Sequence, residues 1–274
     1  MSDSTSPKHY GLWGAGAVLI LFSGAAIMAD LFFGDPLTQR FDRILVEPFQ
    51  PGFLLGTDHL GRDILSRLMY GGRTSLIVSL GSSGIAIVIG APLGIIAAMD
   101  RRGAVDRFLQ LVNDSILAFP TILLAIAVAA VLQAGRSQVM WTLGVVFSPV
   151  LFRITRSEAR KIIHREYYLV SQLLKTPRVI RTILHMLPNI APPVLIQSAS
   201  LAAIAIGTEA ALSFLGLGTQ PPEPSWGLML SDSRRYLSTH PHLSLIPGIA
   251  AGTLAFSFQY LSDQMAAAVT ALEE

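Results

Sequence analysis

The sequence has no cysteine and few charged residues. The absence of cysteine from all 274 residues excludes disulfides, zinc ribbons, iron–sulfur clusters and a thiol nucleophile. Only 14% of the residues are charged, against roughly 25% in soluble domains, whereas 51% are hydrophobic. The net charge of +2 is too small for a nucleic-acid-binding or polybasic membrane-surface protein. These figures also exclude a disordered chain and indicate that lipid is the main solvent.

The motifs of several enzyme classes are also missing. The three lysines are Lys8, Lys161 and Lys175, and none follows a glycine, so the phosphate-binding loop of nucleotide hydrolases is absent. Neither a His-Glu-x-x-His zinc helix nor a Gly-x-Ser-x-Gly nucleophile motif occurs. Asp58, His59 and Asp63 are metal-ligand types close together, but an obvious fourth ligand is lacking. We therefore expect no catalytic residue and no metal or cofactor bound by this chain.

Six long stretches with few or no charged residues predict six membrane-spanning helices. A bilayer core about 30 Å thick requires roughly 20 apolar residues of helix. The six stretches are 11–29, 75–99, 115–135, 137–154, 182–208 and 243–262, of which the fourth continues through one arginine. A cleaved signal peptide is the alternative for the first stretch, although its basic leading region is weak. The expected fold class is an all-α polytopic membrane protein.

The distribution of lysine and arginine predicts the orientation. The densest basic block, Arg153 to Arg181, lies on the same side as both termini and marks the cytoplasmic face. The predicted organisation is a cytoplasmic tail at 1–10, a first helix at 11–34, an extracytoplasmic loop at 35–74, a five-helix core at 75–265 with a cytoplasmic segment at 155–188, and a cytoplasmic tail at 266–274.

The cytoplasmic segment has a helical pattern of its own. Apolar residues three or four apart predict an amphipathic helix over Ile162–Leu174. Thr176 and Pro177 then suit an N-cap and the first position of a second short helix running towards Leu187-Pro188. Such a pair of helices, rimmed by basic side chains, could dock a separate motor protein. An inert basic loop is the alternative.

Two further features lie within the predicted spans. Gly90 with Gly94, and Gly248 with Gly252, are small residues at helical spacing that allow close packing of helices. Glu209 is costly in a membrane helix unless it faces protein or water. A rise of about 1.5 Å per residue places Glu209 close to the outer surface. A structural or interfacial role and a role in the pathway or its gate both remain open.

Several strings of residues resemble the permeases of dipeptide, oligopeptide and nickel ABC importers. The longest is Gly56-Thr57-Asp58-His59-Leu60-Gly61-Arg62-Asp63. It is followed by Leu65-Ser66-Arg67, Gly71-Gly72-Arg73-Thr74-Ser75-Leu76, Ala118-Phe119-Pro120, the stretch from Glu209 to Gly218, and Pro224-Ser225-Trp226-Gly227. Together they are similar to the shorter, C-type subunit over about three quarters of the chain.

The resemblance implies a type I ABC importer permease fold with six transmembrane helices and a cytoplasmic coupling helix. It also implies a second permease subunit, two cytoplasmic ATPases that use ATP and Mg, an extracytoplasmic substrate-binding protein, and a prokaryotic inner-membrane location. The expected function is half of a pathway for short peptides, without enzymatic activity in this chain. A permease for nickel or another small solute is the alternative within the family. A membrane-embedded hydrolase or scaffold is an alternative of another class.

The coupling motif departs from the family pattern. Leu169, Val170 and Ser171 stand where Glu-Ala-Ala is expected, and Lys175 stands where a glycine is expected. The resemblance therefore implies ATPase docking through apolar side chains with a basic rim. The expected docking residues are Tyr167, Leu169, Val170, Ser171, Leu174, Lys175 and Arg178, the family motif of the outer loop is Gly56, Thr57, Asp58, Gly61, Arg62 and Asp63, and Glu209 is the candidate gate or pathway residue.

Overall fold

The computed structural model describes residue 16, residues 19–20, residues 23–24 and residues 28–273. Within these residues the chain is helical apart from loops and two isolated bridges, which confirms the all-α prediction there. The elements are α2 (Ala29–Phe32), α3 (Ile64–Met99), α4 (Ala104–Leu117), α5 (Thr121–Val131), α6 (Arg136–Ile163), α7 (Glu166–Leu173), α8 (Arg178–Arg181), the π-helix η1 (Thr182–Met186), α9 (Leu187–Phe214), α10 (Trp226–Ser233), the 3-10 helix η2 (Arg234–Tyr236) and α11 (His242–Glu273).

Four helical segments are long and apolar enough to cross a membrane, namely Ile64–Met99, Arg136–Ile163, Arg178–Phe214 and His242–Ala271. The helices α4 and α5 together pass the same test but are bent by 89° at their junction. The described residues therefore contain four spans, or five if this bent pair counts as one. Half of the first predicted span, 11–34, lies outside the described residues.

The stretch predicted to span the membrane at 115–135 is not one continuous helix. Helix α4 ends at Leu117 and α5 begins at Thr121, with Pro120 in an extended conformation at ψ 127°. A proline ring disfavours helical geometry at the residue before it and removes a hydrogen-bond donor. The sequence Phe119-Pro120 therefore separates two helices within a stretch that contains no charge.

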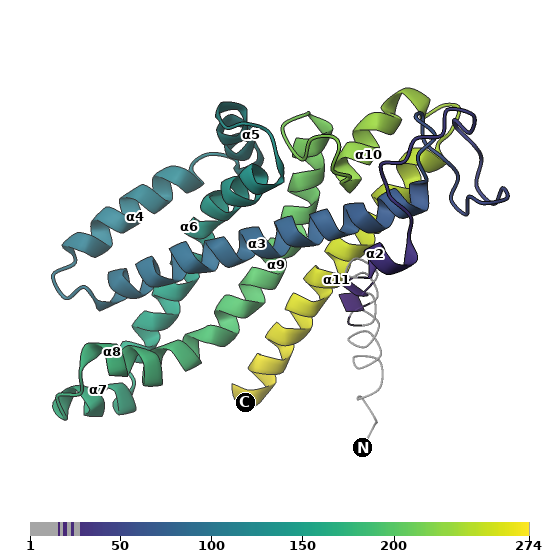
Figure 1. Ribbon diagram of the computed structural model, residues 1–274. Helices are drawn as coiled ribbons and strands as arrows, with labels where there is room; N and C mark the ends of the chain where they lie inside the picture. Colours follow the sequence, from purple (N-terminus) through teal and green to yellow (C-terminus); the bar gives the residue numbers. More distant parts are fainter. Residues whose placement is uncertain (1–15, 17–18, 21–22, 25–27, 274) are drawn as a thin grey trace, which may run out of the picture.

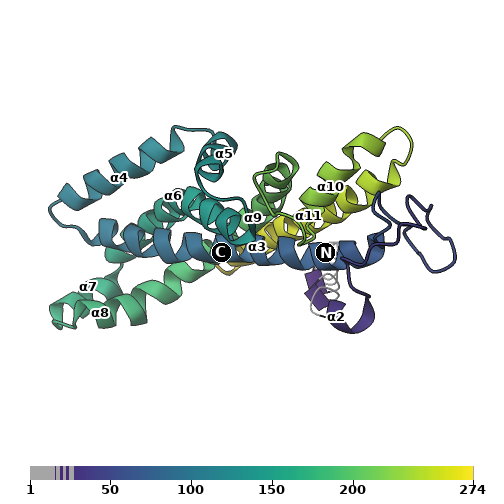
Figure 2. The ribbon, with the colours of Figure 1, turned by 45° about the horizontal axis from the view of Figure 1, so that its top comes forward.

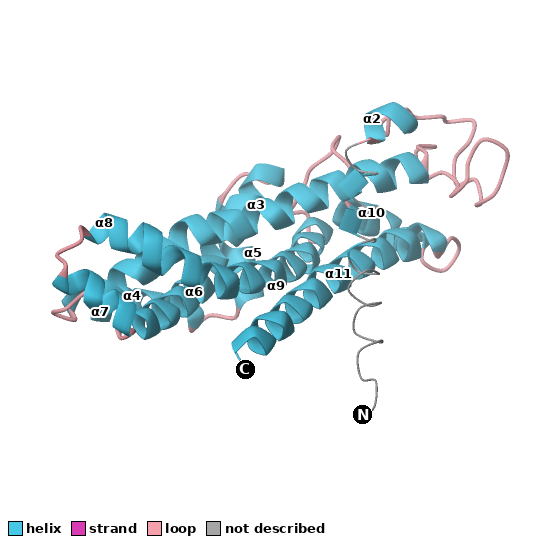
Figure 3. Cartoon of the chain, turned by 90° about the horizontal axis from the view of Figure 1, so that it is seen from below, coloured by secondary structure: helices cyan, strands magenta, loops and turns pink. Residues whose placement is uncertain are grey.

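Helix α3 forms the long axis of the molecule, with 36 residues. It connects the end that carries the loop between α2 and α3 to the end that carries α4, α7 and α8 (Figures 1 and 3). We call these the outer end and the inner end. The helix begins eleven residues before the predicted span because the Asp63 side chain caps it, accepting a 3.0 Å hydrogen bond from the Ser66 amide.

The two glycine pairs behave differently. A Cβ atom on Gly94 would lie 2.7 Å from the Phe152 carbonyl oxygen, and one on Gly90 would meet the backbone of the same helix, α6. Close packing is therefore confirmed for this pair. Gly252 has no atom within 4 Å of an added Cβ, and Gly248 has only Leu230, at 3.8 Å. Among the described residues the second pair therefore makes no close helix contact of the kind expected, since only the Leu230 side chain of α10 reaches it.

The segment predicted to be cytoplasmic, 155–188, is divided differently from the prediction. The expected helix over Ile162–Leu174 is broken at Arg165, whose extended backbone separates the end of α6 from α7. The second short helix does not end at Leu187-Pro188, because α8, η1 and α9 continue as one segment of 37 residues, Arg178–Phe214.

Candidate functional site

The outer-loop motif forms a tight turn that precedes α3. The buried Thr57 hydroxyl accepts a 2.9 Å hydrogen bond from the Val46 amide and donates one of 2.5 Å to the Arg43 carbonyl. Gly56 and Gly61 have φ of 85° and 70°, a region that favours glycine. A side chain on either would also collide with a carbonyl of the opposite segment. These residues therefore shape the loop.

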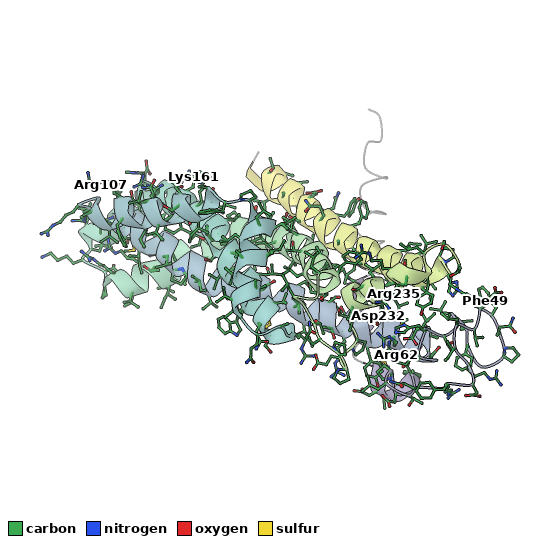
Figure 4. The ribbon with its side chains drawn as sticks, turned by 90° about the horizontal axis from the view of Figure 1, so that it is seen from above. Phe49, Arg62, Arg107, Lys161, Asp232 and Arg235 are labelled. Atoms are coloured by element: carbon green, nitrogen blue, oxygen red, sulfur yellow. The ribbon has the colours of Figure 1, made fainter. Side chains whose placement is uncertain are left out.

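Four charged side chains at this end form a buried network. Arg62 Nε lies 2.7 Å from Asp58 Oδ2, and Arg67 Nε lies 3.5 Å from the same atom. Both arginines also reach Asp232 Oδ2 at 3.3 Å. Figure 4 labels Arg62 and Asp232 at this end of the molecule. Arg67 is only 1% exposed. The network, which we call the outer charge network, ties the loop, α3 and α10 together.

Sequence analysis missed half of this network. Arg67 was part of a family string but was not proposed as a site residue, and Asp232 lies 165 residues from Arg67 along the chain. No local pattern signals a pair so far apart. In the described residues no group of three potential metal ligands is assembled. The Asp58 carboxylate forms ion pairs with Arg62 and Arg67, and the Asp63 side chain caps α3.

Glu209 is buried inside the protein at 1% exposure. Its Oε1 atom accepts hydrogen bonds from the hydroxyls of Ser213 at 2.7 Å and Thr219 at 3.4 Å. Its Oε2 atom accepts one from the Ser75 hydroxyl at 3.4 Å. The carboxylate therefore joins α9 to α3 and to the turn after α9. It faces protein rather than the aqueous surface, which the estimate of depth along the helix could not show.

At the inner end, α7 presents an apolar surface to solvent. Tyr167, Val170 and Leu174 are exposed, Leu174 at 75%, and Leu169 lies beside them. Lys175 and Arg178 are also exposed and follow this surface. We call these residues the α7 face.

Two details correct the predicted docking set. Ser171 is buried and donates a 2.6 Å hydrogen bond to the Tyr168 carbonyl, so its side chain does not belong to the α7 face. Lys175 has φ of 53°, a left-handed conformation. The position where the family motif expects a glycine therefore keeps a backbone conformation typical of glycine although its side chain differs.

Ion pairs join α4 to α6 at the inner end. Asp106 accepts hydrogen bonds from Arg156 Nε at 2.5 Å and from Arg160 Nη2 at 2.7 Å. Asp100 holds the turn between α3 and α4, and backbone hydrogen bonds, above all from the Asp106 amide, lower the pKa of its carboxyl. Figure 2 shows α4 and the α7–α8 segment flanking the inner end of α3.

Comparisons with known proteins agree with this architecture. The model of the family described as "Binding-protein-dependent transport system inner membrane component" matches residues 90–270. The di/tripeptide transport system permease protein of Pseudomonas aeruginosa is 37% identical over 220 residues, which cover 78% of this chain and 72% of that protein. A putative peptide transport system permease protein of Brucella suis is 34% identical over 246 residues, covering 90% and 82%.

Two further similarities extend the comparison. The glutathione transport system permease protein of Pectobacterium atrosepticum is 32% identical over 250 residues, covering 91% of this chain and 83% of that protein. Among solved structures, an inward-facing conformation of the MetNI methionine ABC transporter matches with a TM-score of 0.60 at 17% identity. The match covers 75% of this chain and 97% of that chain. At this identity the structural likeness shows the fold.

Proposed function

Because the chain belongs to the family of inner-membrane components of binding-protein-dependent transport systems, it is a permease of an ABC importer, and we propose that it forms half of a pathway for short peptides. The relatives named for di/tripeptide and peptide transport support this substrate class, and they favour it over nickel. The other half would come from a second permease subunit.

The proposed assembly also contains two cytoplasmic ATPases and an extracytoplasmic binding protein. The α7 face supports this assembly, because Tyr167, Val170 and Leu174 expose apolar surface to water. A partner that covered this surface would remove it from water, which is favourable. ATP and Mg would be used by the ATPases. Their closure would move α7 and, through the continuous segment Arg178–Phe214, the helix that carries Glu209. Such a movement would shift the population of the pore between inward-open and outward-open states.

We propose that the inner end is cytoplasmic, with both termini on that side and six spans in total. The supporting observation is the basic block from Arg153 to Arg181. The chain lacks cysteine, so single cysteines can be introduced at Gln39 and Ser238 of the outer end, which are exposed. They should react with a membrane-impermeant thiol reagent in intact cells.

Matched cysteines at the exposed inner-end positions Arg107 and Ser157 should react only after the cells are opened. These positions are better suited to labelling than Thr57 or Ser171, both of which are buried. Labelling of Arg107→Cys in intact cells at the rate of Ser238→Cys would reverse the proposed orientation.

Uptake measurements test the substrate class. A strain lacking this subunit should lose uptake of labelled dipeptides and tripeptides and regain it when the gene is restored. Labelled nickel is measured in parallel. Loss of nickel uptake without loss of peptide uptake would replace the peptide proposal with the alternative substrate, while the family assignment would stand.

A further inference from the structure

A basic cavity of about 330 Å³ lies at the inner end, beside α7. The cytoplasmic ends of α3 and α6 and the side chains of α7 and α8 form its walls. Four of the lining residues are arginines, Arg101, Arg160, Arg178 and Arg181. Tyr167 and Val170 do not line the cavity, and Arg178 is the residue that the cavity and the α7 face share.

The charges of these arginines are only partly matched within the chain. Arg160 pairs with Asp106 at 2.7 Å, whereas Arg101 donates to the neutral amide oxygen of Gln172 at 3.2 Å. Asp100 also lines the cavity, but its carboxylate already accepts hydrogen bonds from three backbone amides of the following turn. The cavity therefore carries an excess of positive charge.

Arg181 provides the most specific signal. It is 8% exposed, and its guanidinium carbon lies 5.4 Å from the centre of the Tyr168 ring. Among the described residues, no hydrogen-bond acceptor is found for its buried Nε atom. Burying a charged donor without an acceptor is costly, and an anion in the cavity would remove that cost. Arginine is also the residue whose planar donors match the oxygens of a phosphate.

An apolar hollow of about 530 Å³ adjoins this cavity and shares Met99, Asp100, Arg101 and Arg178 with it. The hollow is further lined by Ile96, Arg102 and Val105, all three exposed, so an apolar floor lies between charged side chains. Asp100 is also the first charged residue after Arg73, so the two hollows meet where the apolar run of α3 ends. Lipid headgroups lie at this depth in a bilayer.

We propose that the basic cavity binds the phosphate of an anionic phospholipid, with an acyl chain lying along Ile96 and Val105. A soluble phosphate would use the arginines but not the adjoining apolar hollow. The bound headgroup would contact Arg178 and Arg181 behind α7 and hold the α7 face in position. The inference goes beyond the transported substrate, because lipid binding can be measured without transport.

The test is made on the complete purified transporter after removal of bound lipid. Native mass spectrometry counts dioleoyl phosphatidylglycerol or dioleoyl phosphatidylcholine bound at increasing concentration, with and without excess inorganic phosphate. The test variant is Arg101→Gln/Arg178→Gln, which removes two exposed arginines of the cavity. The matched control, Arg107→Gln/Arg165→Gln, removes two exposed arginines that do not line it. Thermal unfolding confirms that both are folded.

Wild-type and control transporters should bind phosphatidylglycerol preferentially. Each arginine near an anionic lipid contributes about fivefold, so the test variant should bind it about 30-fold more weakly. Equal binding of both lipids would overturn the proposal. We expect that result if an acidic side chain of an ATPase, rather than a lipid, fills the cavity. Equal affinity of the test and control variants would also overturn it. Displacement by inorganic phosphate would show a soluble-anion site instead.

Discussion

The two ends of the molecule use charge in opposite ways. At the outer end, Asp58, Arg62, Arg67 and Asp232 pair with one another and are largely buried (Figure 4). At the inner end, the α7 face and the basic cavity expose apolar and cationic side chains that the chain itself does not cover. The outer charges therefore hold segments of this chain together, whereas the inner end exposes the surfaces that we propose bind other molecules.

The largest expected effect comes from breaking the outer charge network. Arg67→Met keeps most of the side-chain volume but leaves the buried Asp58 and the partly exposed Asp232 with one arginine fewer. Removing one partner from a buried ion pair typically destabilises by about 3–5 kcal/mol. Thermal or chemical unfolding of the purified transporter should show this loss. The control Arg73→Met lies on the same helix and removes an exposed pair with Asp30, which should cost under about 1 kcal/mol.

A smaller effect is expected where α3 packs on α6 near the inner end. Gly94→Leu would force a side chain against the Phe152 carbonyl, and overpacking of this kind costs about 1–3 kcal/mol. The matched change Gly252→Leu on α11 meets no atom of this chain and should leave the unfolding of the isolated subunit unchanged. Equal losses in both variants would contradict the packing described here.

The α7 face should depend on its aromatic side chain more than on its charge. Tyr167 is 42% exposed and lies at the start of α7. A central aromatic in an interface contributes about 2 kcal/mol or more, whereas a charge at the rim contributes little. Tyr167→Ala should therefore uncouple ATP hydrolysis from peptide uptake more severely than Lys175→Ala, in the reconstituted transporter. If only Lys175→Ala uncouples, a specific basic contact replaces the acidic contact of the family.

The smallest difference is expected at Glu209. Glu209→Gln keeps an acceptor for the hydroxyls of Ser213 and Thr219, whereas Glu209→Leu leaves them without this partner. Each hydrogen bond is worth about 1 kcal/mol, so the leucine variant should have the lower stability and uptake. Equal uptake and yield of both variants and the wild type would remove any special role for this carboxylate.

The local sequence was sufficient for several of these features. The low charge and long apolar runs determined an all-α membrane protein, because lipid tolerates neither unpaired backbone groups nor many charges. The spacing of Gly90 and Gly94 identified a close helix contact, and the family strings around Asp58 identified the permease. Each of these signals lies within a short stretch of the chain, where periodicity and composition are informative.

Only the tertiary structure decided which distant side chains meet. It joined Asp232 to Arg67, placed the Ser75 hydroxyl on Glu209, turned Ser171 inward and brought four arginines around one cavity. It also showed that the apolar stretch 115–135 is interrupted at Pro120. No described atom lies within 4 Å of a Cβ atom added to Gly252. These outcomes depend on how helices pack against one another, and packing is set by contacts between segments that no local pattern in the sequence records.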